Sequence, residues 1–210
     1  MVQVTATTHI STITVNTDAV YAKFANTPLK GYEEVFIELS SLYRIDPNWA
    51  LSYLQWESGF AKSAIGLANP TNPWDILCYP GQWSAVGEYR VWNEAEGKEY
   101  CYAKYGSIRI GLEAGFRLWN NYLERGYNTW HQSLSIVLCG NPAGCASQWV
   151  HNVISQGNSN AEQWPSDSQS SLPVAREGLP SLNGTLSDRT LVVGGFLALL
   201  VAGIVAFSRD

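Results

Sequence analysis

Glu57 is the residue of this sequence best placed to act as a general acid. It is expected in the last turn of a helix over residues 47–57, where no other acidic residue follows the capping Asp46. The helix dipole disfavours a negative charge there, and Trp56 and Phe60 would remove water from the carboxylate. Both effects raise a carboxyl pKa, as a general acid requires near neutral pH. The alternative is a surface glutamate bonded to a neighbouring amide.

The residues around Glu57 also predict the helix that must position it. Asp46 is a suitable N-cap, Pro47 suits the first helical position, and Gly59 suits the position after the last turn. The segment between them is apolar on most sides, which is typical of a helix at the centre of a domain. A preceding helix over residues 31–44 is predicted from apolar residues at helical spacing.

The remaining elements predict an α+β domain that is mainly helical. A loop rich in Asn, Pro and Gly is expected over residues 63–76. Strand-like segments over residues 89–93 and 99–103 predict a small β-hairpin with its turn near residues 94–97. Three further helices are predicted over residues 107–126, 130–138 and 146–155.

Three short motifs occur in order along this part of the chain. Residues 55–60 read Gln-Trp-Glu-Ser-Gly-Phe and are soon followed by Ser63, residues 69–76 read Asn-Pro-Thr-Asn-Pro-Trp-Asp-Ile, and residues 105–107 read Tyr-Gly-Ser. Together they resemble the Q-x-E-S-G-aromatic, N-N-(P/L)-(W/F)-x-I and Y-x-S segments of the lysozyme-like glycan hydrolases. The resemblance covers residues 32–154 and is to the bacterial and phage N-acetylglucosaminidase branch, with the lytic transglycosylases as near neighbours.

This resemblance implies a lysozyme-like catalytic domain over residues 31–156 that cleaves β-1,4 glycosidic bonds of peptidoglycan. It gives Glu57 the role of catalytic acid and places Tyr105 near the reacting sugar, with Asn72 and Trp74 shaping the floor of the sugar site. It implies no cofactor and no metal. The implied substrate-binding residues are Ser58, Asn72, Trp74, Asp75 and Tyr105.

No residue is singled out as the second carboxylate. Hydrolases of this type often take a base or nucleophile from the hairpin, which offers Glu88, Glu94, Glu96 and Glu99 as candidates, and Asp75 is a further candidate. Alternatively these are solvated charges and Glu57 acts alone, with the N-acetyl or 6-hydroxyl group of the sugar as nucleophile, as in the transglycosylases. Reducing ends on the product would indicate hydrolysis, and 1,6-anhydro ends would indicate transglycosylation.

The four cysteines fit two disulfides and an oxidising location. Cys139 and Cys145 enclose a short turn-rich loop that a bridge could close, and Cys78 would then pair with Cys101. The alternatives are buried free thiols or a zinc site whose spacing lacks the usual C-x-x-C knuckle. The ligands of that zinc site would be His131, Cys139, Cys145 and His151.

The C-terminal part of the chain differs in composition from the rest. Residues 157–188 are rich in Ser, Pro, Asn and Gly and predict a flexible linker. The uncharged apolar run over residues 191–207 lies between Arg189 and Arg209 and predicts one transmembrane helix within residues 189–208. Small residues recur every four positions along this run, which would let another transmembrane helix or virion protein pack closely.

The charge and composition of the chain bear on which partners and locations are compatible with it. A net charge of -5 without a basic run argues against nucleic-acid binding, and residues 1–30 predict an extended arm without the features of a secretory signal. An anchor and disulfides suit either the virion membrane of a membrane-containing phage, where the enzyme would serve entry, or the bacterial envelope. The competing function is a non-catalytic glycan-binding or structural virion protein that keeps the fold.

Overall fold

The computed structural model describes residues 4–79, 81–141, 143 and 147–166. The fold is α+β and mainly helical, with a small two-stranded sheet, as the sequence predicted. In chain order the elements are α1 Asp18–Phe24, α2 Glu33–Tyr43, α3 Pro47–Glu57, α4 Ala64–Ala68, β1 Ala85–Asn93, β2 Lys98–Tyr105, α5 Ile108–Glu124, α6 Trp130–Cys139 and α7 Gln148–Gln163.

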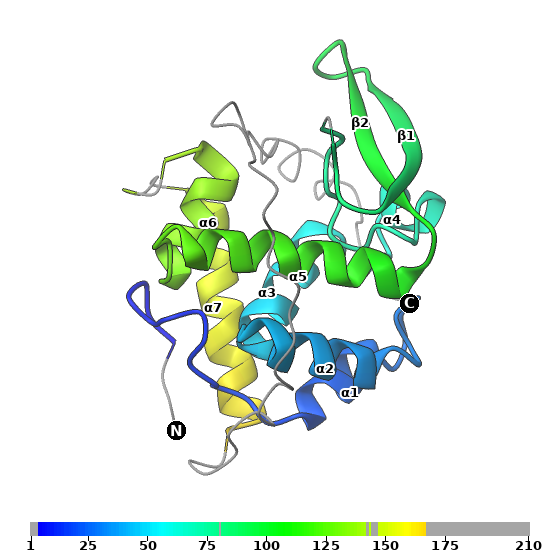
Figure 1. The fold of residues 1–210 in the computed structure, drawn as a ribbon. Coiled ribbons are helices and arrows are strands. Elements are labelled where there is room, and N and C mark those ends of the chain that lie inside the picture. The colour runs from blue at the N-terminus through cyan, green and yellow to red at the C-terminus, as the bar shows by residue number, and fades with distance from the viewer. Residues whose placement is uncertain (1–3, 80, 142, 144–146, 167–210) are drawn as a thin grey trace, which may run out of the picture.

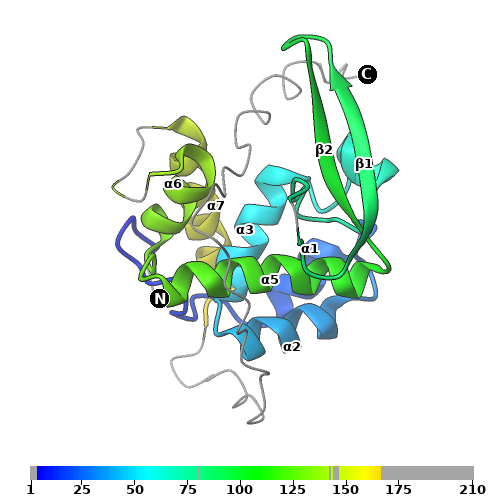
Figure 2. The ribbon, with the colours of Figure 1, turned by 45° about the horizontal axis from the view of Figure 1, so that its top comes forward.

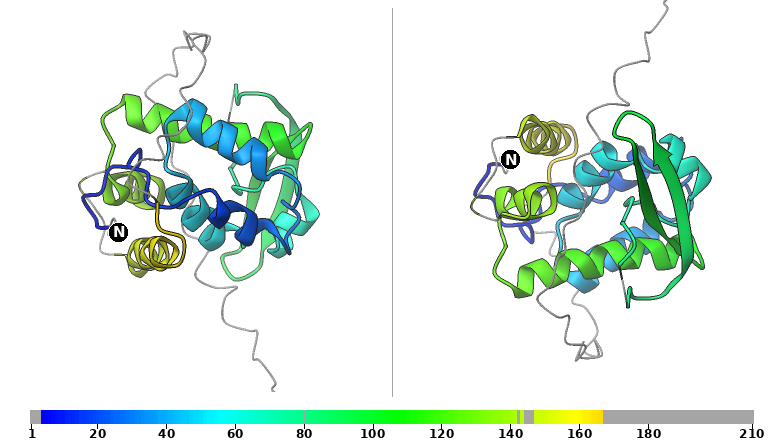
Figure 3. Two further views of the ribbon diagram at one scale, coloured as in Figure 1. Left: turned by 90° about the horizontal axis from the view of Figure 1, so that it is seen from below. Right: turned by 90° about the horizontal axis from the view of Figure 1, so that it is seen from above.

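Helix α3 lies at the centre of the helical body, where it packs against α1, α2 and α7 (Figures 1 and 2). The hairpin of β1 and β2 projects from one end of this body, beside α4, while α6 and α7 lie at the other end (Figure 3). Helix α5 packs against both α2 and β2. The chain that leaves α3 passes through α4 and a loop before it enters β1.

Aromatic side chains fill the interior between α3, α5 and the loop that precedes the hairpin. Trp49 and Tyr53 of α3 contact Trp119 of α5 with ring centroids 4.5 and 4.6 Å apart, respectively. Trp74 of the loop contacts Phe116 of α5 edge to face at 5.5 Å. Such pairs add stability beyond the burial of their area. The tryptophan and phenylalanine rings of this group therefore belong to the core rather than to a sugar site.

The N-terminal segment is integrated into the domain, in contrast to the extended arm expected over residues 1–30. Ile10 and Val15 are fully buried, and the segment continues into α1. The Ile10 amide donates to the Asn128 carbonyl at 2.8 Å, and the Asp46 amide donates to the Ile10 carbonyl at 2.6 Å. Thr14 is buried beside Val15 and donates from Oγ1 to the capping Asp46 at 2.6 Å, so this segment covers the start of α3.

Helix α7 continues to Gln163, beyond the predicted end at Ser155, and occupies part of the expected linker. Gly157 allows this helix to approach Trp130, whose Cη2 atom would lie 2.4 Å from an added Cβ. The buried Asn160 amide donates to Asn48 Oδ1 of α3 at 3.0 Å. The polar composition of this segment resembles that of a linker because its contacts use a glycine and hydrogen-bonding amides instead of large apolar residues.

Residues 167–210 lie outside the described part of the chain. The predicted transmembrane run over residues 191–207 is therefore among the residues that are not described. Within the described ranges, none of the helices combines the length and apolar character that a membrane span needs.

The predicted disulfide between Cys78 and Cys101 is present and joins the segment before the hairpin to β2. The Cys78 amide also donates to the Cys101 carbonyl at 2.8 Å. Cys145 lies outside the described residues, so the pairing of Cys139 with Cys145 stays a prediction.

Replacing Cys78 and Cys101 together by serine should lower the free energy of unfolding by about 2 kcal/mol, because the bridge restricts the unfolded chain. Urea unfolding of the double variant and the wild-type chain measures the difference. Equal unfolding midpoints would contradict this stabilising role.

Candidate active site

The sequence places Glu57 at the end of α3 through a well-formed cap at the other end of the helix. The Asp46 side chain accepts from the Asn48 amide at 3.0 Å, and Thr14 Oγ1 donates to it at 2.6 Å. Glu57 is the last residue of α3 and is partly buried. Trp56, which we expected to cover Glu57, is exposed instead, because adjacent residues of a helix point in different directions.

A tight turn follows Glu57 and fixes the direction in which the chain leaves α3. Gly59, Phe60 and Ala61 all have left-handed backbones, with φ of 58°, 60° and 63°. The strain that Phe60 and Ala61 carry is sustained by the surrounding structure. Ser58 stabilises the turn, since its Oγ accepts from the Ala61 amide at 3.0 Å and donates to the Pro73 carbonyl at 2.6 Å. Ser58 therefore links the end of α3 to the next motif instead of reaching a substrate.

Asn72 and Trp74 hold the loop that carries Asp75. Asn72 is fully buried, accepts from the Ile76 amide at 3.0 Å and donates to the Ile76 carbonyl at 2.9 Å. Trp74 is 2% exposed and donates from Nε1 to the Leu112 carbonyl at 3.0 Å. The resemblance implied that both side chains contact the sugar. Both instead lie inside the domain, where their hydrogen bonds hold the backbone of the site.

Tyr105 is also buried, at 2% exposure, and the third motif contacts the second through it. Its amide donates to Thr71 Oγ1 at 3.3 Å, and its hydroxyl accepts from Gln82 Nε2 at 2.9 Å. Burial raises the pKa of the Tyr105 hydroxyl. The residue at this position thus joins the base of β2 to the loop over residues 69–76.

Glu57 and Asp75 form the electrostatic centre of the site. Burial raises the pKa of Glu57 to about 7, against the opposing effect of a hydrogen bond from Tyr53. Burial and the charge of Glu57 raise the pKa of Asp75 to about 8. Two acids that affect each other in this way titrate as a pair and retain protons up to near neutral pH.

Tyr53 of α3 and Tyr102 of β2 complete this centre. Burial is the main cause that raises the pKa of each hydroxyl, and the charges of Glu57 and Asp75 act on both of them. Neither tyrosine was a candidate site residue from the sequence. Tyr53 carried a weak signal, since it lies four residues before Glu57 and faces the same side of a helix.

Two of the hairpin carboxylates proposed from the sequence, Glu88 and Glu99, form ion pairs away from this centre. Glu88 and Glu99 both pair with Arg90, at 2.6 and 2.7 Å, and all three side chains are about half exposed. Within the described residues, neither Glu88 nor Glu99 is among the causes that shift the pKa of Glu57. Glu88 and Glu99 therefore form a solvated ion-pair cluster on the outside of the hairpin.

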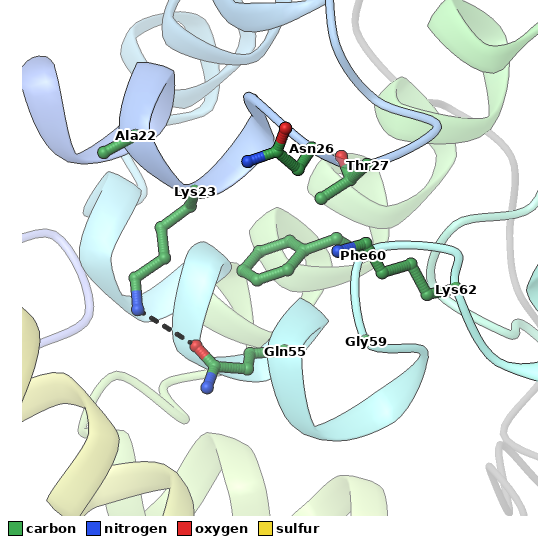
Figure 4. A pocket seen from close by; sticks show the side chains of 8 residues that line it. All are labelled: Ala22, Lys23, Asn26, Thr27, Gln55, Gly59, Phe60 and Lys62. Atoms are coloured by element: carbon green, nitrogen blue, oxygen red, sulfur yellow. Dashed lines mark hydrogen bonds between the residues drawn. The ribbon is translucent and has the colours of Figure 1, made fainter. Parts of the chain in front are cut away.

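A pocket of about 370 Å³ lies beside the end of α3 (Figure 4). Lys23 of α1 donates from Nζ to Gln55 Oε1 at 3.2 Å within it, and burial lowers the Lys23 pKa. Glu57 and Asp75 are not among its lining residues, so this pocket is separate from the acid pair. The lining residues are Ala22, Lys23, Asn26, Thr27, Gln55, Gly59, Phe60 and Lys62.

The described side chains give little support for a bound metal. One group of three potential ligands is Cys78, Glu88 and Cys101, but its two sulfur atoms are joined in the disulfide and are not thiolates. The zinc site considered from the sequence includes Cys145, which lies outside the described residues.

The raised pKa of Glu57 predicts a loss of stability as the pH rises. The unfolded-state value is near 4.5 and the folded-state value is about 7, so the contribution of Glu57 to stability is fully present below about pH 4.5 and is lost as the pH rises towards 8. Glu57→Gln removes this dependence. At about pH 8 it should therefore be more stable than the wild type by about 2 kcal/mol, with little difference near pH 4.5. Urea unfolding at both pH values measures this, with the exposed Glu94→Gln as the control. Parallel pH dependences for Glu57→Gln and wild type would contradict it.

No protein-family model matches the chain, and no curated protein matches it. Among solved structures, the catalytic domain of the autolysin Auto from Listeria monocytogenes is distantly similar, with 17% sequence identity and a TM-score of 0.39. The match covers 67% of this chain and 84% of that one. A likeness this distant carries no statement about activity, so the residues of the site must support any function.

Proposed function

We propose that the protein cleaves β-1,4 glycosidic bonds in the glycan strands of peptidoglycan, with Glu57 as the general acid. The observation that carries this proposal is a partly buried carboxyl group at the end of the central helix, whose pKa burial raises to about 7. Such a group is protonated at and below neutral pH and can donate its proton to the oxygen of a leaving sugar.

The arrangement of the three motifs supports the choice of substrate. Ser58 of the first motif donates to the Pro73 carbonyl of the second, and Tyr105 of the third donates its amide to Thr71 of the second. The three motifs, which resemble one family and follow its order along the chain, are therefore also joined to one another in the fold, and the first of them contains Glu57.

Two other functions are compatible with parts of this site. A lytic transglycosylase would use Glu57 with the 6-hydroxyl group of the sugar as nucleophile. A non-catalytic glycan-binding or structural virion protein would keep the fold without chemistry. The cost of burying Glu57 and Asp75 disfavours the second function, because a binding protein needs no desolvated acids.

The proposal includes a location at a membrane, which rests on the apolar run over residues 191–207. The bilayer, and with it other transmembrane helices or virion proteins, would be partners of this run. A phage virion membrane or the bacterial envelope would place the catalytic domain close to peptidoglycan.

Purified peptidoglycan sacculi distinguish a cutting enzyme from a binding protein. The full chain should both sediment with sacculi and release soluble glycan fragments from them over time. Sedimentation with sacculi that stay intact would instead support the binding function and contradict the proposal.

A further inference from the structure

We propose that Asp75 is the second catalytic carboxylate, which accepts a proton from the water that attacks the sugar while Glu57 protonates the leaving oxygen. This inference rests on the proposed function and makes the reaction a hydrolysis. Among the candidates from the sequence, it selects Asp75 of the loop before the hairpin over the carboxylates of the hairpin.

The side chain of Asp75 is buried without a complete set of partners. It is 8% exposed, and within the described ranges its Oδ1 atom has no hydrogen-bond partner. Buried polar atoms of proteins are almost always hydrogen-bonded, so an unpaired carboxylate oxygen indicates a site for a water or a ligand group. A purely structural aspartate would use both oxygens to hold the loop.

The backbone of Asp75 is held in an unfavourable conformation that fixes this orientation. Its φ is 51°, in the left-handed region that residues other than glycine rarely adopt. The Asp75 amide donates to the Asn72 carbonyl at 3.2 Å, and the Ala103 amide of β2 donates to the Ile76 carbonyl at 2.9 Å. Strain of this kind is typical of active sites.

Asp75 lies near Glu57 because a hydrogen bond joins the segment that follows Glu57 to the loop that carries Asp75. Ser58, the residue after Glu57, donates to the carbonyl of Pro73, two residues before Asp75, at 2.6 Å. The charge of Glu57 acts on Asp75, and both charges act on Tyr53 and Tyr102. Glu88 and Glu99 are not among the groups whose charges act on Glu57 or Asp75, and Arg90 binds both of them at the surface.

The chemistry needs one proton on the pair. When the pair holds a single proton, a glycosidic oxygen can accept a hydrogen bond only if that proton is on Glu57, so bound substrate favours ionised Asp75. The bond between C1 and the glycosidic oxygen then breaks as Glu57 gives its proton to that oxygen. Water forms the new bond to C1, and its proton goes to Asp75. Exchange with solvent restores the starting state.

Two substitutions of the full chain test this role. Asp75→Asn keeps the shape of the side chain and should lower the rate of reducing-end formation on purified glycan by about 10²-fold or more, as expected for loss of a general base. Asp75→Gly suits the positive φ, so it should fold, and it leaves space for a small anion. Sodium azide should raise the cleavage rate of this variant by about tenfold or more and give a glycosyl azide as product. Glu88→Gln and Glu99→Gln are matched controls that should stay within about threefold of wild type.

The outcomes separate this inference from the proposed function. If the wild type cleaves glycan and Glu57→Gln does not, but Asp75→Asn is within about threefold of wild type, the role of Asp75 is overturned and that of Glu57 stands. A folded Asp75→Gly variant that azide does not restore, or wild-type products with only 1,6-anhydro ends, would also overturn it. If the wild type cleaves no glycan, the proposed function itself fails.

Discussion

Glu57→Gln should lower the rate of glycan cleavage by about a thousandfold, within the range expected for loss of a general acid. The amide is nearly the same size as the carboxyl group and can still accept a hydrogen bond from Tyr53, but it has no proton to give. Affinity for peptidoglycan should be unchanged, because the loss falls on the chemical step. Fragment release from sacculi measures the rate, and sedimentation measures binding.

The exposed hairpin residue Glu94 provides a matched control for Glu57→Gln. Glu94→Gln changes the net charge equally and should retain the wild-type rate. An unchanged rate in Glu57→Gln would mean that another group supplies the proton. Equal loss in both variants would point to a general effect of charge.

Gly115→Ala should destabilise the domain by about 3 kcal/mol or more and reduce activity with it. A Cβ atom at this position of α5 would lie 2.2 Å from Nε1 of Trp74. The indole would have to move, which would break its hydrogen bond to the Leu112 carbonyl and shift the loop that carries Asp75. Urea unfolding measures the stability, and fragment release measures the activity.

Gly87 of β1 is the comparison for Gly115→Ala, because a Cβ added there meets nothing within 4 Å. Gly87→Ala should therefore change stability by less than about 0.5 kcal/mol. If Gly115→Ala unfolds at the same urea concentration as wild type, Trp74 is not held tightly against α5.

The elements around Glu57 could be predicted because their signals are local. Asp46, Pro47 and Gly59 mark the two ends of α3, and Ser107 caps α5 through the Ile110 amide. The hairpin was predicted from two strand-like segments, whose register pairs Asn93 with Lys98 across the turn. In each case the residues that determine the structure are neighbours in sequence.

The features that the sequence did not predict depend on contacts between distant residues. Asp75 comes near Glu57 only through the bond from Ser58 to Pro73, and no periodic pattern reports such a contact. Similarly, α7 continues to Gln163 because Asn160 bonds to α3, although its composition resembles a linker. Substrate-binding roles were implied for Asn72 and Trp74, but both side chains are buried. Their burial depends on how the core packs, which the motif alone does not report.

The most direct test of the account uses isolated glycan strands from which the peptides have been removed, so that only glycosidic bonds can be cut. Mass spectrometry of the products after incubation with the full chain, wild type or Glu57→Gln, identifies every new end. We expect shorter strands with new reducing ends at β-1,4 linkages from the wild type, and unchanged strands from Glu57→Gln. Strands that stay at full length with the wild-type protein would contradict the claim that it cleaves glycan.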